Sequence, residues 1–245
     1  MSQGHFMTIQ TISALAIDNQ LIALVEQEAR DKILSICTSV ELTPGTVLAD
    51  ANEPYHYVYF PVSGFISLFA VAADNPPLGI GLVGNEGMLG VTLLVGEKKS
   101  PLQAIVQSPC TAWRMPSEKF HLALQLWPAL AVVLKHYIYS VIQQFSQEAV
   151  CVNFHGIEAR LARWLLMSHD RTEGNTLDLT HVFLARILGV RRSGVSIAAH
   201  KLSDKALIAY TRGKIEILDR KGLEKKSCAC YKIGIKILEA SQALR

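Results

Sequence analysis

The chain has 245 residues, half of them hydrophobic and 18% charged, so it can bury a sizeable core and is not expected to be disordered. Five cysteines at this length exclude a disulfide-rich secreted scaffold. The formal net charge of +3 conceals an asymmetry: residues 1–155 carry 7 Lys and Arg against 12 Asp and Glu, a net −5, whereas residues 156–245 carry 17 against 9, a net +8. We therefore expect two parts, of which the basic one binds a polyanion; an ordinary solvated basic surface is the alternative.

Neither a leader nor a membrane span is expected. The first residues, MSQGHFMTIQ, show no basic segment that leads into an apolar run. The most apolar region, LALQLWPALAVVLKHYIYSVI, is interrupted by Gln125, Pro128, Lys135 and His136. We expect a cytoplasmic protein with no membrane partner.

The first half begins with a helical pattern over residues 11–37 and then changes to short strands. The apolar positions of the helical pattern are Leu21, Ile22, Leu24 and Val25. From Glu41 onward, segments such as YHYVYF and SGFISLFAV alternate with the turn signals TPG, NEP, PVSG and DNPP. This pattern predicts an antiparallel sandwich or roll that closes at residues 111–115, before a helix for which Ser117 is the expected N-cap.

A long helix follows, with Pro128 at a suitable first position. Its apolar residues recur alternately four and three apart, which is the spacing of a coiled-coil seam. The seam residues are Leu134, Ile138, Val141, Phe145, Ala149 and Val152. A core helix of the same domain is the commoner use of such a stripe. We expect a dimer helix, because it connects a β-module to a basic half and DNA readers of this size often pair.

The basic half has the pattern of a winged helix-turn-helix. An amphipathic helix, GIEARLARWLLMSHD, precedes a short strand with Leu177 and Leu179 on one face. Thr180 is a good N-cap for the helix HVFLARIL, which ends at Gly189, a residue suited to a tight interhelical turn. Val190 suits the buried position of that turn. The second helix, from about Arg191, buries Val195, Ala198, Ala199 and Leu202. The stretch LIAYTRGKIEILD then predicts a hairpin that turns at residues 212–214.

This order of elements resembles the Crp/Fnr family of bacterial transcription regulators over nearly the whole chain. The resemblance rests on PGTVLADANEPYHYVYFPVSGFISL and GNEGMLGV in the first half, and above all on LDLTHVFLARILGVRRSGVSIAAHKLSDKALIAYTRGKIEILDRKGLE. It implies an α+β fold: an antiparallel β-roll (jelly roll) with N-terminal helices over 1–127, a dimerisation helix over 128–155, and a DNA-binding winged helix-turn-helix over 156–245. The expected function is that of a homodimeric, sequence-specific transcription regulator. RNA polymerase is a further expected partner if the regulator activates transcription.

The second helix is expected to enter the major groove of DNA. Arg192 is the best base reader, because a guanidinium donates two hydrogen bonds to guanine, and it matches the arginine that begins base contact in the family. Ser193 and Ile197 replace a glutamate and an arginine of the family, so the operator should differ. Weaker base-edge candidates are Ser193, Ser196 and His200. The expected phosphate contacts are Thr180, Arg191, Lys201, Arg212 and Lys214.

The resemblance also implies an effector pocket in the roll. Its residues here are Gly84, Glu86, Gly87, Met88 and Gly90. Members that bind cyclic nucleotides carry a glutamate after the glycine and an arginine downstream, whereas Val91 follows Gly90 here and Ser100-Pro101 stand where the arginine belongs. Lys98 and Lys99 offer charge without a bidentate fork. Control by cyclic AMP is therefore disfavoured, and the effector is unknown.

No metal or haem site can be identified from the spacing of donor residues. Cys110 and Cys151 lie in apolar segments and are expected in the core, and Cys37 is alone near the N-terminus. Cys228 and Cys230 form a C-x-C pair, for which metal binding or a response to oxidants is the alternative; two ligands do not make a zinc site, so we expect a structural or incidental role. The histidines show no ligand spacing.

An enzyme is the first rival hypothesis. A metal-dependent β-roll enzyme needs a histidine cluster, whereas the β-region has only His56, and neither G-x-S-x-G nor a phosphate-binding loop occurs. We therefore expect no enzyme. The second rival is a regulatory subunit whose winged helix contacts protein, and DNA affinity that falls steeply with salt would distinguish the regulator from it.

Overall fold

The computed structural model describes residues 19–243. The expected helix over 11–37 begins outside this range, and inside it the chain forms two short helices, α1 (Gln20–Ala23) and α2 (Gln27–Ser35). The helical pattern is therefore confirmed in the described part, with a break over residues 24–26 between the two helices. Asn19 fixes the first of them on the β-roll: its side chain accepts a hydrogen bond from Ile22 N and donates to Pro61 O and Gly87 O.

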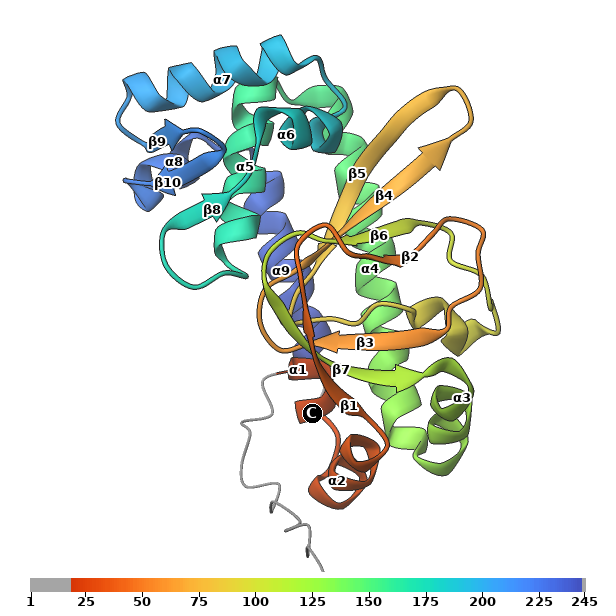
Figure 1. The fold of residues 1–245 in the computed structure, drawn as a ribbon. Coiled ribbons are helices and arrows are strands. Elements are labelled where there is room, and N and C mark those ends of the chain that lie inside the picture. The colour runs from red at the N-terminus through yellow and green to blue at the C-terminus, as the bar shows by residue number, and fades with distance from the viewer. Residues whose placement is uncertain (1–18, 244–245) are drawn as a thin grey trace, which may run out of the picture.

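Two antiparallel sheets form the β-roll that the sequence predicts (Figure 1). One sheet has the order β1-β7-β3 and the other the order β2-β6-β4-β5. The strands are β1 (Thr38–Leu42), β2 (Val47–Ala49), β3 (Tyr57–Pro61), β4 (Ile66–Ala72), β5 (Asn75–Val83), β6 (Gln103–Val106) and β7 (Cys110–Pro116). The first core contains fully buried Phe60, Ile66 and Met115 from these strands.

Helical elements complete the roll. They are the short 3-10 helix η1 (Val91–Val95), α3 (Ser117–Leu126) and the long helix α4 (Pro128–Phe154). Pro128 is the first residue of α4, as predicted. Ser117 is not an N-cap: it lies inside α3, and Pro116 precedes the helix without a side-chain capping bond. No single described helix has the length and apolar character of a membrane span; only α3 and α4 taken together pass that test, and they are bent by 112°.

The basic half folds as a winged helix-turn-helix with a three-stranded sheet in the order β8-β10-β9. Its elements are α5 (Ile157–His169), β8 (Thr176–Asp178), α6 (His181–Leu188), α7 (Arg192–Asp204), β9 (Ile208–Thr211), β10 (Lys214–Ile217), α8 (Arg220–Lys226) and α9 (Cys230–Gln242). Buried Trp164 and Leu165 of α5 lie in its core. Helices α8 and α9 are not expected from the sequence patterns, and α9 packs back along α4 (Figure 1).

The winged helix rests on the roll through α6. The β4–β5 hairpin reaches this helix (Figure 1), where Gly79 leaves room for Ile187, because a Cβ on Gly79 would lie 2.7 Å from the Ile187 side chain. The Arg186 guanidinium lies 4.4 Å from the centre of the Phe69 ring and donates to Gln103 Oε1. These contacts leave α7 on the outer side of the molecule, remote from the roll.

Candidate nucleic-acid interface

The turn between α6 and α7 forms as the residues predict. Thr180 Oγ1 accepts a hydrogen bond from Phe183 N at 3.1 Å, which caps α6. Gly189 ends the helix with φ 62° and ψ 39°, a left-handed conformation that residues with a side chain rarely adopt. Val190 follows half-buried against the core, and α7 begins at Arg192. The helical conformation is interrupted between α6 and α7, and this turn lets α7 cross α6.

Helix α7 has one buried and one exposed face. Val195, Ala198, Ala199 and Leu202 are all buried, as predicted. The exposed face carries Arg192, Ser193, Ile197, His200 and Lys201. Figure 1 shows α7 along the edge of the molecule that is farthest from the roll. His200 lies 3.6 Å from Asp204 on the next turn, so part of its charge is offset when it is protonated.

The wing is a tight hairpin. Thr211 pairs with Lys214, so Arg212 and Gly213 form a two-residue turn, with φ 46° and 88°. Positive φ at both positions is the requirement of a type I′ turn, which matches the twist of the two strands. Lys214 is the first residue of β10, is exposed and lies 3.9 Å from Asp178. The turn therefore holds two exposed cations at the tip of the wing.

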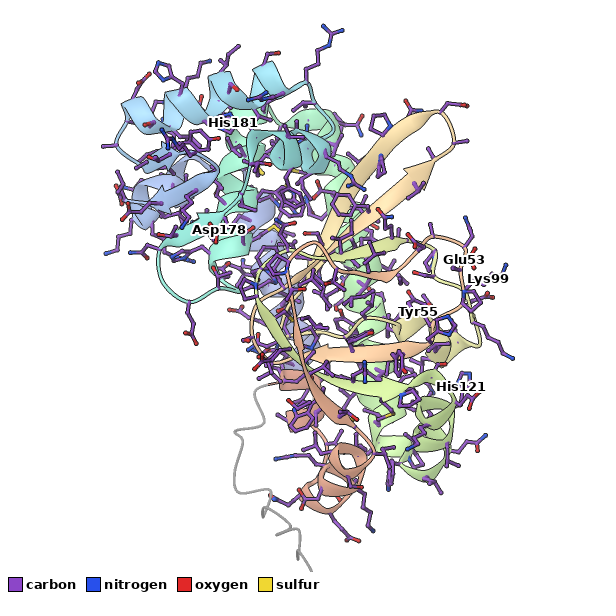
Figure 2. The ribbon with its side chains drawn as sticks, viewed as in Figure 1. Glu53, Tyr55, Lys99, His121, Asp178 and His181 are labelled. Atoms are coloured by element: carbon purple, nitrogen blue, oxygen red, sulfur yellow. The ribbon has the colours of Figure 1, made fainter. Side chains whose placement is uncertain are left out.

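His181 connects the parts of the interface, although the sequence pattern does not single it out. Figure 2 labels His181 below α7. The His181 ring stacks on Tyr210 of β9 with centroids 4.1 Å apart, and Nδ1 lies 3.0 Å from Ser196 Oγ of α7. Burial and the neighbouring Arg192 guanidinium lower the pKa of His181, so the ring is neutral at pH 7. Ser196 also donates to Arg192 O, so its hydroxyl is engaged inside the domain. No helical or strand periodicity links His181 to these two partners, which is why sequence inspection does not pair them.

Two family models match the chain in the order of its domains. The cyclic nucleotide-binding domain matches residues 39–125, and the Crp-like helix-turn-helix domain matches residues 159–226, so that together they span well over half of the sequence. The chain belongs to the Crp/Fnr family. This Crp/Fnr protein is thus a DNA-binding transcription regulator, in a family that is not enzymatic.

Solved structures share the fold. FixK2 from Bradyrhizobium japonicum has a TM-score of 0.66 at 16% identity, and the match covers 79% of this chain and 98% of FixK2. A CRP-family transcriptional regulator from Thermus thermophilus has a TM-score of 0.62 at 18% identity, covering 77% and 96%. CLP, the c-di-GMP responsive global regulator of Xanthomonas campestris, has a TM-score of 0.61 at 16% identity, covering 78% and 99%. No curated protein matches the sequence significantly.

The residues expected to line the effector pocket of this Crp/Fnr protein pack against its own side chains. Gly87 lies against Tyr137 of α4, whose hydroxyl occupies the space that a Cβ at that position would need. Gly90 packs against Val58, and Met88 is buried in the first core. Glu86 faces the other domain rather than a cavity. The pocket formed by these residues therefore stays a prediction, and in this structure Gly87, Met88 and Gly90 pack against the chain's own side chains.

Glu86 forms a buried ion pair across the domain boundary. Its Oε1 accepts hydrogen bonds from Arg171 Nε at 2.9 Å and Nη2 at 2.8 Å, and from Gly84 N at 3.0 Å. Both side chains are less than a tenth exposed. Arg171 Nη1 donates to Met167 O, so the guanidinium is held from both domains. Beside this pair, a cleft of about 590 Å³ lies between the roll and β8, lined by Ser63, Ser108 and Thr172 among others.

The cations near the expected ligand are turned to solvent. Lys98 and Lys99 are exposed, and Figure 2 shows Lys99 at the outer edge of the roll. Ser100, which stands where cyclic-nucleotide-binding members have an arginine, is buried and bonds to Tyr55 Oη and Leu102 O. No described side chain therefore offers a bidentate cation at this position.

The expected dimer seam is partly wrong. Leu134 is 0% exposed in the subunit, so it belongs to the core of its own chain and cannot contact a partner. Ile138, Val141 and Phe145 are half-buried against the same core, and Phe145 lies against Gly81 of β5. The exposed apolar residues of α4 lie on another face: Val132, Tyr139, Ile142, Val150 and Phe154. Of the expected seam, Val152 is half-buried and Ala149 is exposed.

The fold brings four possible metal ligands together near the end of α4. Cys151 and His155 come from the end of α4, and Cys228 and Cys230 from the connection between α8 and α9. The sequence predicts Cys151 as a core cysteine and assigns no role to His155. It shows Cys228 and Cys230 as an isolated C-x-C pair. The sequence signals are the C-x-C pair and the i, i+4 spacing of Cys151 and His155, and nothing in the sequence joins the two. Cys110 is buried in the first core, as predicted.

Proposed function

We propose that this Crp/Fnr regulator binds DNA as a homodimer, with α7 of each subunit in the major groove, and that cyclic nucleotides do not control this binding. The supporting observation is α7 itself: a Gly189 turn presents its cationic face outward while four apolar residues hold the other face in the core. The division into an effector-type domain (1–127), a connecting helix (128–155) and a DNA-binding domain (156–245) is part of this proposal.

Base recognition is assigned to the exposed start of α7. Arg192 is exposed on the first turn, where helices of this class contact base edges, and its guanidinium suits guanine O6 and N7. Ser193 is exposed beside it, and His200 lies further along the same face. Ser196 is a weaker reader than its position suggests, because its hydroxyl already bonds within the domain.

Phosphate contacts are assigned to residues that flank α7. They are Thr180, Arg191, Lys201, Arg212 and Lys214, all of which are exposed. The type I′ turn places Arg212 and Lys214 at the wing, where a neighbouring phosphate backbone would pass. These cations would release counterions on binding, so the affinity should fall steeply with salt.

Dimerisation is assigned to the exposed face of α4. Val132, Tyr139, Ile142 and Ala149 are exposed and lie seven, three and seven residues apart, so they fall on the a and d positions of one heptad register, with Lys135 and Ser146 at the positions between them. The half-buried side chains of Val133, Ile138, Val141 and Phe145 on α4 already pack on the roll. Two copies of α4 would therefore pair through a face that the subunit leaves open.

Independence from cyclic nucleotides is supported by the filled pocket. A cyclic phosphate would lose its hydration without gaining a bidentate cation, because Ser100 replaces the arginine and Lys98 and Lys99 are exposed to solvent. Tyr137 and the Glu86–Arg171 pair occupy the space beside Gly84 and Gly87.

Fluorescence anisotropy with a labelled duplex tests the proposal. We expect DNA binding that weakens steeply as salt rises and that neither cyclic AMP nor cyclic GMP alters at micromolar concentration. Titration calorimetry with each nucleotide is the companion measurement. Absence of DNA binding would support the regulatory-subunit alternative, and saturable nucleotide binding that raises DNA affinity would contradict the assignment of the pocket.

A further inference from the structure

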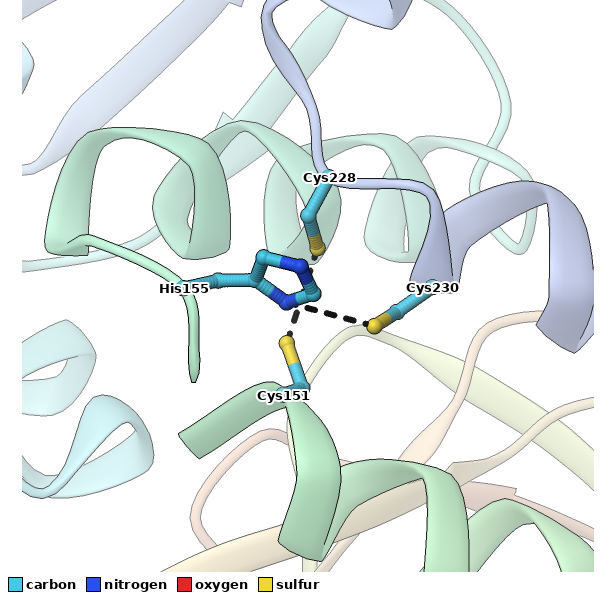
Figure 3. Close-up of side chains that lie close together, drawn as sticks. All are labelled: Cys151, His155, Cys228 and Cys230. Atoms are coloured by element: carbon cyan, nitrogen blue, oxygen red, sulfur yellow. Dashed lines mark hydrogen bonds between the residues drawn. The ribbon is translucent and has the colours of Figure 1, made fainter. Parts of the chain in front are cut away.

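Three thiols and one imidazole lie together at the junction of the connecting helix and the winged helix. Their ligand atoms, Cys151 Sγ, Cys228 Sγ, Cys230 Sγ and a His155 ring nitrogen, all lie within 4.8 Å of one another. Figure 3 shows the three sulfur atoms gathered around the His155 ring. All three cysteines are buried and His155 is half-buried. The cluster lies outside the proposed DNA interface and the effector-type domain, so neither of them accounts for it.

Two of the separations between these atoms are close to the edges of a tetrahedral metal site. Cys151 Sγ lies 3.5 Å from Cys228 Sγ, and Cys230 Sγ lies 3.4 Å from His155 Nδ1. With zinc–sulfur bonds of about 2.3 Å and zinc–nitrogen bonds of about 2.0 Å, tetrahedral geometry places two sulfurs about 3.8 Å apart and a sulfur and a nitrogen about 3.5 Å apart. A small inward or outward shift of each side chain would therefore suffice to coordinate one ion.

The elements that hold the ligands fix their relative positions. Cys151 is on the last turn of α4, and His155 is its C-cap one turn later, so the two share a face. Cys230 begins α9, and Cys228 stands two residues before it. Helix α9 packs along α4, which keeps the two pairs opposite each other.

Two polar groups beside the cluster would support sulfur atoms that bind a metal. Gln147 Nε2 donates a hydrogen bond to Cys230 Sγ at 3.1 Å, as donors around metal-bound sulfur do. The buried Arg163 guanidinium, paired with Glu148, lies near enough to Cys151 and Cys228 to interact with their charge. Three thiolates and a neutral imidazole would leave one negative charge on the zinc complex.

We propose that Cys151, His155, Cys228 and Cys230 bind one zinc ion in a closed structural site. Three sulfurs and one nitrogen are ligands that zinc prefers, and four protein ligands leave no open position for catalysis. The three thiols release their protons as the ion binds. The ion would fasten the α8–α9 segment to the end of α4 and so fix the angle at which the DNA-binding domain leaves the connecting helix. The proposal does not depend on the DNA-binding assignments.

Metal content and cobalt spectroscopy test this site in the full chain. Elemental mass spectrometry of purified wild-type protein should find about one zinc ion per chain. After removal of zinc with a chelator, Co²⁺ should restore one equivalent of metal. It should also produce the intense visible absorption of tetrahedral cobalt together with near-ultraviolet thiolate-to-cobalt charge transfer.

Variants separate this site from other cysteines. Cys228→Ser should lose nearly all bound zinc and, after cobalt loading, the charge-transfer band. Cys37→Ser should keep both, because Cys37 is a half-buried cysteine far from the cluster in the sequence. His155→Ala should weaken zinc affinity by at least about tenfold. The cobalt titration of wild-type protein requires no variant, so a failure of Cys228→Ser to fold does not affect the test.

Several results would overturn the proposal. One is folded, fully reduced wild-type protein that takes up neither zinc nor cobalt. Another is metal-free protein in which mass spectrometry finds a Cys151–Cys228 disulfide, because that would make the pair a redox site. Bound iron with a broad visible band in freshly purified protein would likewise replace the zinc assignment.

Discussion

At the scale of single residues, Arg192 and Lys214 are expected to contribute to DNA binding in different ways. Arg192→Ala should weaken binding to the preferred sequence by about 1–3 kcal/mol and relax the preference at one base pair in each half-site, because it removes a bidentate base contact. Competition binding with single-base variants of the operator measures both effects. Unchanged affinity together with unchanged preference would remove Arg192 from the role of reader.

Lys214→Ala serves as the matched comparison at the wing. Since a lysine on phosphate carries no sequence information, the variant should bind all sequences more weakly by a similar factor and reduce the slope of log affinity against log salt by about one. A selective loss on the preferred sequence would instead indicate that Lys214 contacts a base.

His181 makes the stability of the winged helix depend on pH. Its pKa is lowered from 6.5 in the folded state, so the unfolded chain takes up a proton first as pH falls, and the folded state loses stability below that pH. Above it both states are neutral and the contribution is complete. Protonation would also place a hydrogen on Nε2, which is buried without a partner among the described residues.

We therefore expect the melting temperature of wild-type protein to fall more between about pH 7.5 and about pH 5.5 than that of His181→Phe. The variant keeps an aromatic ring to stack on Tyr210 and loses the titrating group. Thermal unfolding at several pH values measures the difference. Parallel curves for the two proteins would show that His181 does not titrate differently on folding.

At the scale of elements, the Glu86–Arg171 pair joins the loop after β5 to the segment after α5. Glu86→Leu should lower the free energy of unfolding by about 3–5 kcal/mol, because it leaves a buried guanidinium without its carboxylate. The double variant Glu86→Leu/Arg171→Met should recover most of that loss. Urea denaturation measures both. A loss below about 0.5 kcal/mol for the single variant would mean that water reaches the pair.

The open face of α4 predicts the oligomeric state. Tyr139 and Ile142 are 61% and 57% exposed, so Tyr139→Glu/Ile142→Glu should give a folded monomer that binds an operator with two half-sites far more weakly. Leu122→Glu, at an exposed apolar residue of α3, is the control that should remain a dimer. Charges at Ile138 and Phe145 should instead destabilise the subunit, since both pack on the roll. Sedimentation measures the oligomeric state of each variant. A Tyr139→Glu/Ile142→Glu protein that remains a dimer would contradict the proposed seam on α4.

Helix α4 also shows why sequence alone misplaces the seam. Apolar residues lie on more than one of its faces, and helical periodicity does not tell which face packs on the subunit's own sheets. Helix α7 has a single continuous apolar face, so Val195, Ala198, Ala199 and Leu202 are correctly predicted as its buried residues. The Gly189 turn is likewise predictable, because a local requirement for positive φ selects glycine.

At the scale of the whole molecule, two features that sequence inspection misses depend on contacts between residues distant along the chain. Cys151 and Cys228 are 77 residues apart and meet only because α9 returns along α4. The pair Glu86–Arg171 spans 85 residues and turns an expected pocket residue into a domain contact. The order of the two domains and the β-roll, by contrast, follow from local patterns of strands, turns and charge.

The same architecture predicts the symmetry of the DNA sequences that the protein selects. Two winged helices joined by paired α4 helices would face the duplex with a two-fold axis between them, so each half-site is the inverted copy of the other. The contacts of α6 with the β4–β5 hairpin leave one face of α7 exposed, and we predict that the protein alone binds DNA.

Selection of bound sequences from random duplex DNA, with purified protein and no added ligand, tests this most directly. We predict enrichment of an inverted repeat whose half-site centres lie about 10 base pairs, one helical turn, apart. The repeat should be lost when Arg192→Ala replaces the wild-type protein. Recovery of no enriched sequence, or of a single half-site without a repeat, would contradict a dimeric reader built on α7 and α4.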